Sequence, residues 1–191
     1  MNYSELVFAA LPLFYFMFIA SMTPGPNNVM LTASGMNFGY MRTIPHILGI
    51  IFGFLSLIIL AALGIGAMYK ALPQIEIALK ILGSLYLVYL AFKIATSGRV
   101  GVKEKAKKTV RPLNFFEAFA FQFINPKGVV FAVAAISVLP QGLSILETIM
   151  IIIPVSLINS SLSTHTWTLF GKVIAALFRH EKARHIINAL L

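Results

Sequence analysis

Cysteine is absent from all 191 residues of the sequence. Its absence excludes disulfide bonds, thiolate metal ligands and thiol redox chemistry from this chain. A membrane protein that passes electrons through paired cysteines is excluded for the same reason. Any chemistry must therefore come from amides, hydroxyl groups, imidazoles, amines and backbone groups.

Charged residues are also scarce: they make up 11% of the sequence, whereas soluble globular proteins have about 25%. The carboxylates all lie near the end of an apolar run or between runs, namely Glu5, Glu76, Glu104, Glu117, Glu147 and Glu181. Paired carboxylates for hydrolysis or metal binding are therefore not expected, and neither a metal nor a cofactor is predicted. No serine–histidine–acid arrangement recurs at one depth, so an enzyme is disfavoured.

Apolar residues dominate what is present. They account for 59% of the chain, and the mean hydropathy is +0.88, which indicates a protein that resides in lipid. At roughly 20 residues per membrane-spanning helix, the chain allows about six spans and no further domain. The net charge of +9 does not indicate nucleic acid, because the basic residues cluster between apolar runs, as they do in membrane proteins.

The apolar runs predict one all-α transmembrane domain over residues 1–191. The expected spans are 6–36 with an interruption, 44–68, 75–94, 115–139 and 144–170, followed by a short run at 186–191. That last run would rise only about 9 Å against a hydrocarbon core of about 30 Å, so the sixth helix is expected to be truncated. The first run has neither a basic segment before it nor a cleavage site after it, which favours a retained span over a signal peptide. Gly35, Asn37 and Gly39 predict the turn that follows it.

Basic residues set the expected orientation. Residues 37–43, 93–112 and 171–185 hold twelve of the 15 lysines and arginines. Such segments stay on the cytoplasmic side, so the loop 96–112 is predicted to be cytoplasmic and the N-terminus periplasmic. The halves 1–95 and 113–191 would then form an inverted repeat of three helices each.

Two proline-containing interruptions lie deep inside apolar runs: Thr23-Pro24-Gly25-Pro26-Asn27-Asn28 and Asn125-Pro126-Lys127. Proline lacks an N–H and restricts the residue before it, so the first and fourth helices must open there. Pro24 and Pro126 are 102 positions apart, which places both breaks at one position of the repeat. Irregular backbone at membrane depth persists only where protein buries it or it lines a wet cavity, and paired breaks indicate a transport site.

Each residue of the two breaks is assigned to this expected site. The half-helix that starts at Asn27, together with Lys127, is expected to bind a substrate carboxylate. Carbonyl groups freed by the prolines, with Asn28 and Asn125, are expected to bind its ammonium group. The predicted binding residues are Thr23, Pro24, Gly25, Pro26, Asn27, Asn28, Asn125, Pro126 and Lys127. Because no carboxylate lies at mid-membrane, a zwitterion with a neutral side chain fits better than lysine or arginine.

Two other interpretations remain open for these residues. The breaks could be kinks that only let helices pack, and the Lys127 ammonium could reach a membrane interface. Lys127 and His165 are candidates for a proton relay, because His165 follows a polar stripe in the fifth span; a histidine hydrogen-bonded within the bundle is the alternative. His46 is expected at an interface. Gly49 and Gly53 form a GxxxG pattern that permits close helix packing.

The first break resembles the signature of the LysE/RhtB family of amino-acid exporters, since Met22-Thr23-Pro24-Gly25-Pro26-Asn27-Asn28 is followed by Gly35, Gly39, Gly49 and Gly53. Phe123-Ile124-Asn125-Pro126-Lys127 is similar to the break in that family's fourth helix. Residues 91–97 and 121–125 are most similar to its cysteine/O-acetylserine exporter branch. The resemblance covers nearly the whole chain, although a completed sixth helix is the family norm.

The resemblance implies an inner-membrane protein that exports small amino acids or their derivatives using the proton gradient. Its partners would be the amino-acid substrate, the lipid bilayer and protons, and a homo-oligomer is a candidate assembly. The competing hypothesis is a structural or assembly subunit that transports nothing. That hypothesis predicts that Pro24, Asn27 and Lys127 tolerate substitution.

Overall fold

The computed structural model describes residues 3–65, 111–140 and 142–179. The third expected span (75–94), most of the basic segment and the last apolar run (186–191) lie outside these residues. Within them every element is helical, which confirms the all-α prediction for the described part of the chain. The elements are α1 (Tyr3–Met22), α2 (Pro26–Phe38), α3 (Tyr40–Leu60), a π-helical turn η1 (Ala61–Ile65), α6 (Phe115–Ile124), α7 (Pro126–Val138) and α8 (Ile145–Arg179).

Both predicted helix breaks are confirmed. The chain bends by 57° between α1 and α2, and by 67° between α6 and α7. A proline opens each second half-helix, Pro26 in α2 and Pro126 in α7, where its missing N–H has no intrahelical partner to lose. By length and composition, two helices could each cross a membrane, and the described residues reach four spans if each bent pair counts as one.

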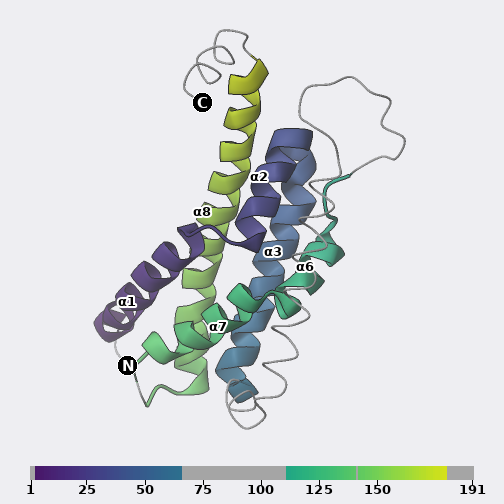
Figure 1. The fold of residues 1–191 in the computed structure, drawn as a ribbon. Coiled ribbons are helices and arrows are strands. Elements are labelled where there is room, and N and C mark those ends of the chain that lie inside the picture. Colours follow the sequence, from purple (N-terminus) through teal and green to yellow (C-terminus); the bar gives the residue numbers. More distant parts are fainter. Residues whose placement is uncertain (1–2, 66–110, 141, 180–191) are drawn as a thin grey trace.

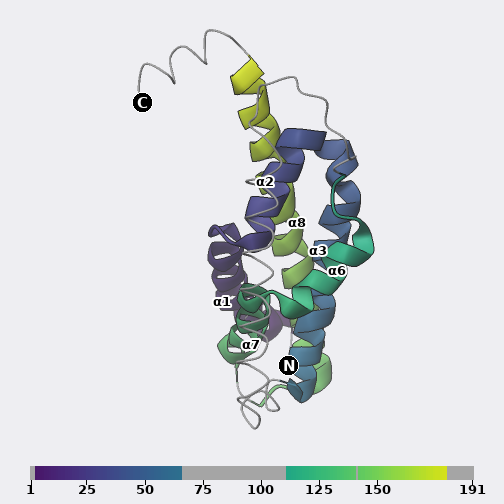
Figure 2. The same ribbon diagram turned by 45° about the vertical axis from the view of Figure 1, so that its right-hand side comes forward.

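The long helices α3 and α8 form the frame on which the broken pairs pack (Figure 1). The α1–α2 pair packs mainly on α8, whereas the α6–α7 pair packs mainly on α3. Figures 1 and 2 show the two pairs running in opposite directions along the frame. The end of α2, the start of α3 and the end of α8 lie together at one end of the molecule.

The turn expected around Gly35 is wrong, because α2 continues through it to Phe38. A Cβ atom at Gly35 would overlap the backbone carbonyl of Thr168 in α8, and one at Gly171 would overlap that of Thr32 in α2. Gly35 therefore serves a close helix crossing. The turn itself falls at Gly39, whose φ of 78° suits glycine.

Two span boundaries also differ from expectation. The helix expected over 44–68 starts earlier, at Tyr40, and passes into the π-helical turn after Leu60. The helix expected over 144–170 continues to Arg179. Lysine is a good helix former, so Lys172 did not end the helix, and the apolar residues 173–178 continue it.

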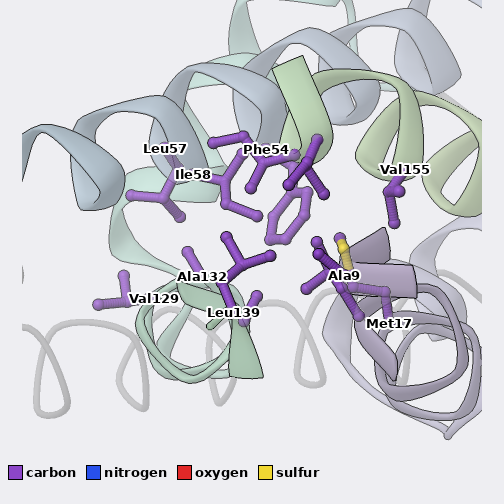
Figure 3. Close-up of a cluster of buried hydrophobic side chains, with 13 residues drawn as sticks. Ala9, Met17, Phe54, Leu57, Ile58, Val129, Ala132, Leu139 and Val155 are labelled. Atoms are coloured by element: carbon purple, nitrogen blue, oxygen red, sulfur yellow. The ribbon is translucent and has the colours of Figure 1, made fainter. Parts of the chain in front are cut away.

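The main hydrophobic core joins both broken pairs to the frame. Figure 3 shows side chains of α1, α3, α7 and α8 converging, with Met17, Phe54, Ala132 and Val155 among them. Within a membrane, close van der Waals packing of these side chains holds α1 and α7 in place.

The GxxxG pattern lies directly against α6. A Cβ atom at Gly49 would overlap the carbonyl of Phe115, and one at Gly53 would lie 2.7 Å from both Phe119 O and Gln122 Cγ. Glycine is therefore required at both positions for the backbones of α3 and α6 to approach this closely.

Candidate functional site

The two helix breaks touch each other through Lys127. Its ammonium group donates hydrogen bonds to Thr23 O at 2.7 Å, Thr23 Oγ1 at 2.8 Å and Pro24 O at 3.3 Å. The carbonyl end of a helix carries a partial negative charge, so a cation is favoured after α1. The Lys127 ammonium group thus holds the first break, and its expected role in binding a substrate carboxylate stays a prediction.

Asn28 and Ser163 complete the bonding of the first break. Asn28 Nδ2 donates to Ser21 O and Thr23 O, both at 2.8 Å, and Ser163 Oγ donates to Ser21 O at 2.8 Å. Carbonyl groups in an apolar setting require such donors. Three protein side chains, counting Lys127, therefore occupy the carbonyls of Ser21, Thr23 and Pro24, where sequence reasoning placed an ammonium group.

The starts of the two second half-helices differ. Asn125 Oδ1 accepts a hydrogen bond from the backbone N–H of Lys127 at 3.2 Å, so α7 is capped by its own chain. Gly25, at the start of α2, provides no side-chain cap. The N–H groups of Asn27 and Asn28 precede the first intrahelical bond, from Val29 N to Gly25 O at 2.9 Å. The start of α2 is therefore the end that offers donors and a positive dipole to an anion.

Asn27 is held by Gln122, a residue that sequence reasoning missed. Asn27 Nδ2 donates to Gln122 Oε1 at 2.7 Å, and Gln122 Nε2 donates back to Asn27 Oδ1 at 3.2 Å. Gln122 also donates to Ala118 O at 2.9 Å and is fully buried. One indication was available, since this glutamine interrupts an apolar run three positions before Asn125.

Residues of both breaks line one cavity, together with residues of α3 and α8. It offers about 60 Å³ to the centres of water-sized groups; at roughly 10–15 Å³ for each group, that is room for about four to six. Six of the nine predicted binding residues line it: Gly25, Pro26, Asn27, Asn28, Asn125 and Lys127. Thr23 and Pro24 bind Lys127 instead, and Pro126 lines a neighbouring apolar hollow.

The cavity wall combines apolar side chains, such as Met17 and Phe54, with amides and hydroxyl groups, and it is nearly uncharged. Among the described residues that line it, Lys127 is the sole titratable side chain, and none is a carboxylate. From α8 come Asn159, Ser160, Ser163 and Thr164, the stripe noted in the sequence. The site therefore suits a small ligand that needs hydrogen bonds and has no cationic side chain to neutralise.

The two histidines of the described chain, His46 and His165, lie outside the wall of this cavity. His165 is not part of the cavity wall, and its Nδ1 lies 3.0 Å from the hydroxyl of Tyr40. His46 lies near the start of α3 and is buried in the bundle, with 1% of its surface exposed; the interfacial depth expected for it stays a prediction. Neither ring nitrogen of His46 has a hydrogen-bond partner within the described part of the chain.

A capping box and an ion pair hold the start of α6, the helix that leads to the second break. Asn114 and Glu117 form a reciprocal capping box, with both bonds at 2.9 Å. Arg111 donates to both Glu117 oxygens, at 2.7 and 2.8 Å, and these hydrogen bonds raise the pKa of Arg111. The pair anchors α6 just before it enters the apolar region.

The sequence of this chain is similar to a known protein family and to named efflux proteins. Residues 18–191 match the family described as LysE type translocator. A cysteine/O-acetylserine efflux protein of Escherichia coli O157:H7 is 34% identical over 180 residues, which cover 91% of this chain and 88% of that protein. A protein of the same name from Salmonella paratyphi A is 33% identical over 177 residues, with the same coverage. No solved structure matches this chain.

Proposed function

This chain belongs to the LysE type translocator family, and from that premise we propose that it exports small neutral amino acids or derivatives, of the cysteine and O-acetylserine kind, across the bacterial inner membrane. Its family and its membrane-length helices make it a multi-pass membrane transporter rather than an enzyme. The substrate class follows the names of the relatives and is supported by the absence of carboxylates from the described cavity wall.

One observation carries the proposal: the uncapped start of α2 opens at the cavity between the two breaks. A substrate carboxylate binds there, to the N–H groups of Asn27 and Asn28 and in the field of the helix dipole. Lys127, with its charge near the same cavity, contributes attraction for the carboxylate while it holds the first break. A cationic side chain finds no carboxylate partner in the described wall of this cavity.

Transport proceeds by alternating access around this cavity, within a single domain made of two inverted repeats. The opposite directions of the α1–α2 and α6–α7 pairs support the repeat, as does the packing of each pair on the long helix of the other half. The end of the molecule that holds the start of α3 and the end of α8 faces the cytoplasm, and the N-terminus lies in the periplasm. Arg42, Arg111 and Lys172 of the described chain support this orientation.

Proton entry drives export, and Lys127 carries the proton. As the sole titratable group in the described cavity wall, Lys127 couples its charge directly to the contact between the breaks. Loss of its proton removes the positive charge and one donor, which weakens the bonds to Thr23 and Pro24. His165 remains a second candidate, although its pairing with Tyr40 outside the cavity gives it less support.

Inside-out membrane vesicles test the proposal, because export then appears as uptake. The assay measures uptake of radiolabelled cysteine, O-acetylserine and arginine, with a proton gradient and after its collapse by an ionophore. Gradient-dependent uptake of the two neutral compounds, lost in a normally inserted Lys127→Ala variant, is expected. Preference for arginine would contradict the substrate class. Full uptake by the Lys127→Ala variant would contradict the site, and no uptake at all would favour a structural subunit.

A further inference from the structure

We propose that Asn159 Oδ1 binds the ammonium group of the substrate and so selects amino acids over carboxylic acids that lack the amine. This inference rests on the proposed function and extends it, since the breaks themselves account only for the carboxylate. It also assigns a role to a helix, α8, that contains neither break.

Asn159 is fully buried on α8 and lines the cavity. Its Nδ2 donates to Val155 O at 2.9 Å. A carbonyl oxygen can only accept, so this bond determines which way the amide group is turned. The other amide atom, Oδ1, is a buried acceptor without a hydrogen-bond partner among the described residues.

An acceptor buried without a donor is unfavourable and uncommon in folded proteins. Among the described residues of the cavity wall, Asn159 Oδ1 is the one buried polar side-chain atom without a hydrogen-bond partner. An ammonium group brings three N–H donors, and a hydrogen bond from a charged donor is stronger than one from a neutral donor. A ligand with an amine would therefore supply the donor that Asn159 Oδ1 lacks among the described residues.

The rest of the site makes this assignment specific. The carbonyl oxygens of Ser21, Thr23 and Pro24 already accept from Asn28, Ser163 and Lys127. Asn27 Oδ1 and Asn125 Oδ1 also have donors. The acceptors that the sequence suggested for an ammonium group are thus largely used within the protein, whereas Asn159 Oδ1 is not.

The carboxylate and the ammonium group of an amino acid would then bind to different walls of one cavity, one with donors and one with an acceptor. The start of α2 provides N–H donors for the carboxylate, and Asn159 on α8 provides the acceptor for the ammonium group. Oδ1 is covered in this conformation, so the ammonium group reaches it as the wall opens around the ligand.

The test compares cysteine with 3-mercaptopropionate, which is cysteine without its amino group. Binding is measured on the purified full chain in detergent and reducing buffer, from the concentration of each compound that raises the unfolding temperature. The wild type is expected to bind cysteine about 10- to 100-fold more tightly, as one charge-assisted hydrogen bond implies. Asn159→Leu is expected to bring the ratio near one by weakening cysteine binding alone.

Two further variants keep the result interpretable. Asn159→Asp retains an acceptor and is expected to retain the preference for cysteine. If the leucine variant fails to fold, the binding ratio of the aspartate variant tests the role of the acceptor. Ser161→Ala, a change on the same helix outside the cavity wall, is expected to behave as the wild type.

Each failure has a separate meaning. An unchanged ratio in Asn159→Leu, or a ratio near one in Asn159→Asp, would overturn the role of Asn159 while leaving export intact. A wild-type protein that binds neither compound and takes up no neutral amino acid in vesicles would instead overturn the proposed function.

Discussion

Lys127 and Thr23 lie 104 positions apart and are joined by two hydrogen bonds from one ammonium group, at 2.7 Å to the carbonyl and 2.8 Å to the hydroxyl of the threonine. The contact makes the two helix breaks one structural unit. It also places a group that can gain or lose a proton at the point where the broken helices meet. Binding, proton transfer and helix movement can therefore influence one another here.

Lys127→Gln should separate the structural role of this contact from its charge. Glutamine retains an N–H donor for Thr23 but cannot titrate, so we expect the proton gradient to stop stimulating uptake in this variant. Exchange of labelled for unlabelled substrate without a gradient should persist. Uptake in inside-out vesicles measures both. Lys172→Gln, on an exposed part of α8, is the matched control, and an undiminished response of the Lys127→Gln protein to the gradient would rule out proton transfer by this lysine.

Gly25→Ala should impair export without impairing folding. An added Cβ would lie 2.6 Å from Lys127 Cδ and 2.9 Å from its Nζ, so the lysine must move away from Thr23. The flexible side chain can do so at little cost, and φ of −170° suits any residue at this position. Gly128→Ala, where the nearest atom is 3.4 Å away, is the control. Membrane insertion and uptake are measured together; equal uptake by the two variants would count against the role of the Lys127 contact.

Asn27 and Gln122 should show strong energetic coupling. Gln122→Leu leaves the amide of Asn27 unpaired, and Asn27→Leu does the same to Gln122, so each change should lower the free energy of unfolding by about 1–3 kcal/mol. The double variant should lose less than the sum, with a coupling energy of about 0.5–3 kcal/mol. Denaturation in detergent of all four proteins measures this cycle. Strictly additive losses would mean that the amide pair contributes nothing.

Gly49→Ala should destabilise the fold itself. The new Cβ would overlap the Phe115 carbonyl and lie 2.7 Å from the Ala118 Cβ, and neither a backbone atom nor a short side chain can turn aside. Overpacking of this kind costs about 1–3 kcal/mol. The unfolding temperature measures the effect, with Gly128→Ala again as the tolerated change. A stable Gly49→Ala protein would show that α3 and α6 can separate without loss.

Local chemistry explains which parts of this fold could be predicted. Pro24, Pro26 and Pro126 break helices through their own geometry, so both breaks could be placed from the sequence alone. The turn expected near Gly35 failed for the opposite reason, since this glycine serves a contact with Thr168, 133 positions away. Whether a glycine forms a turn or permits a close helix crossing depends on the helix that packs against it, which the local sequence does not reveal.

The site was predictable as a location and less so as a set of bonds. The sequence predicted that Asn27, Asn28 and Lys127 lie close together. It did not predict that their side-chain N–H groups donate to Gln122, Ser21 and Thr23, respectively. Those partners follow from the 57° and 67° bends, which no residue pattern encodes. The unpaired oxygen of Asn159 likewise becomes visible only once α8 lies against the breaks.

The absence of cysteine permits the most direct test of the central claim, that a small neutral amino acid binds between the two breaks. Ser160→Cys places a single thiol in the cavity wall, and Lys172→Cys places one on an exposed, polar part of α8 outside that wall. The rate of modification by a charged thiol reagent is measured with and without O-acetylserine. The account predicts that O-acetylserine slows modification at position 160 and not at position 172, and that arginine slows neither. An exporting Ser160→Cys protein whose modification rate ignores O-acetylserine would contradict it.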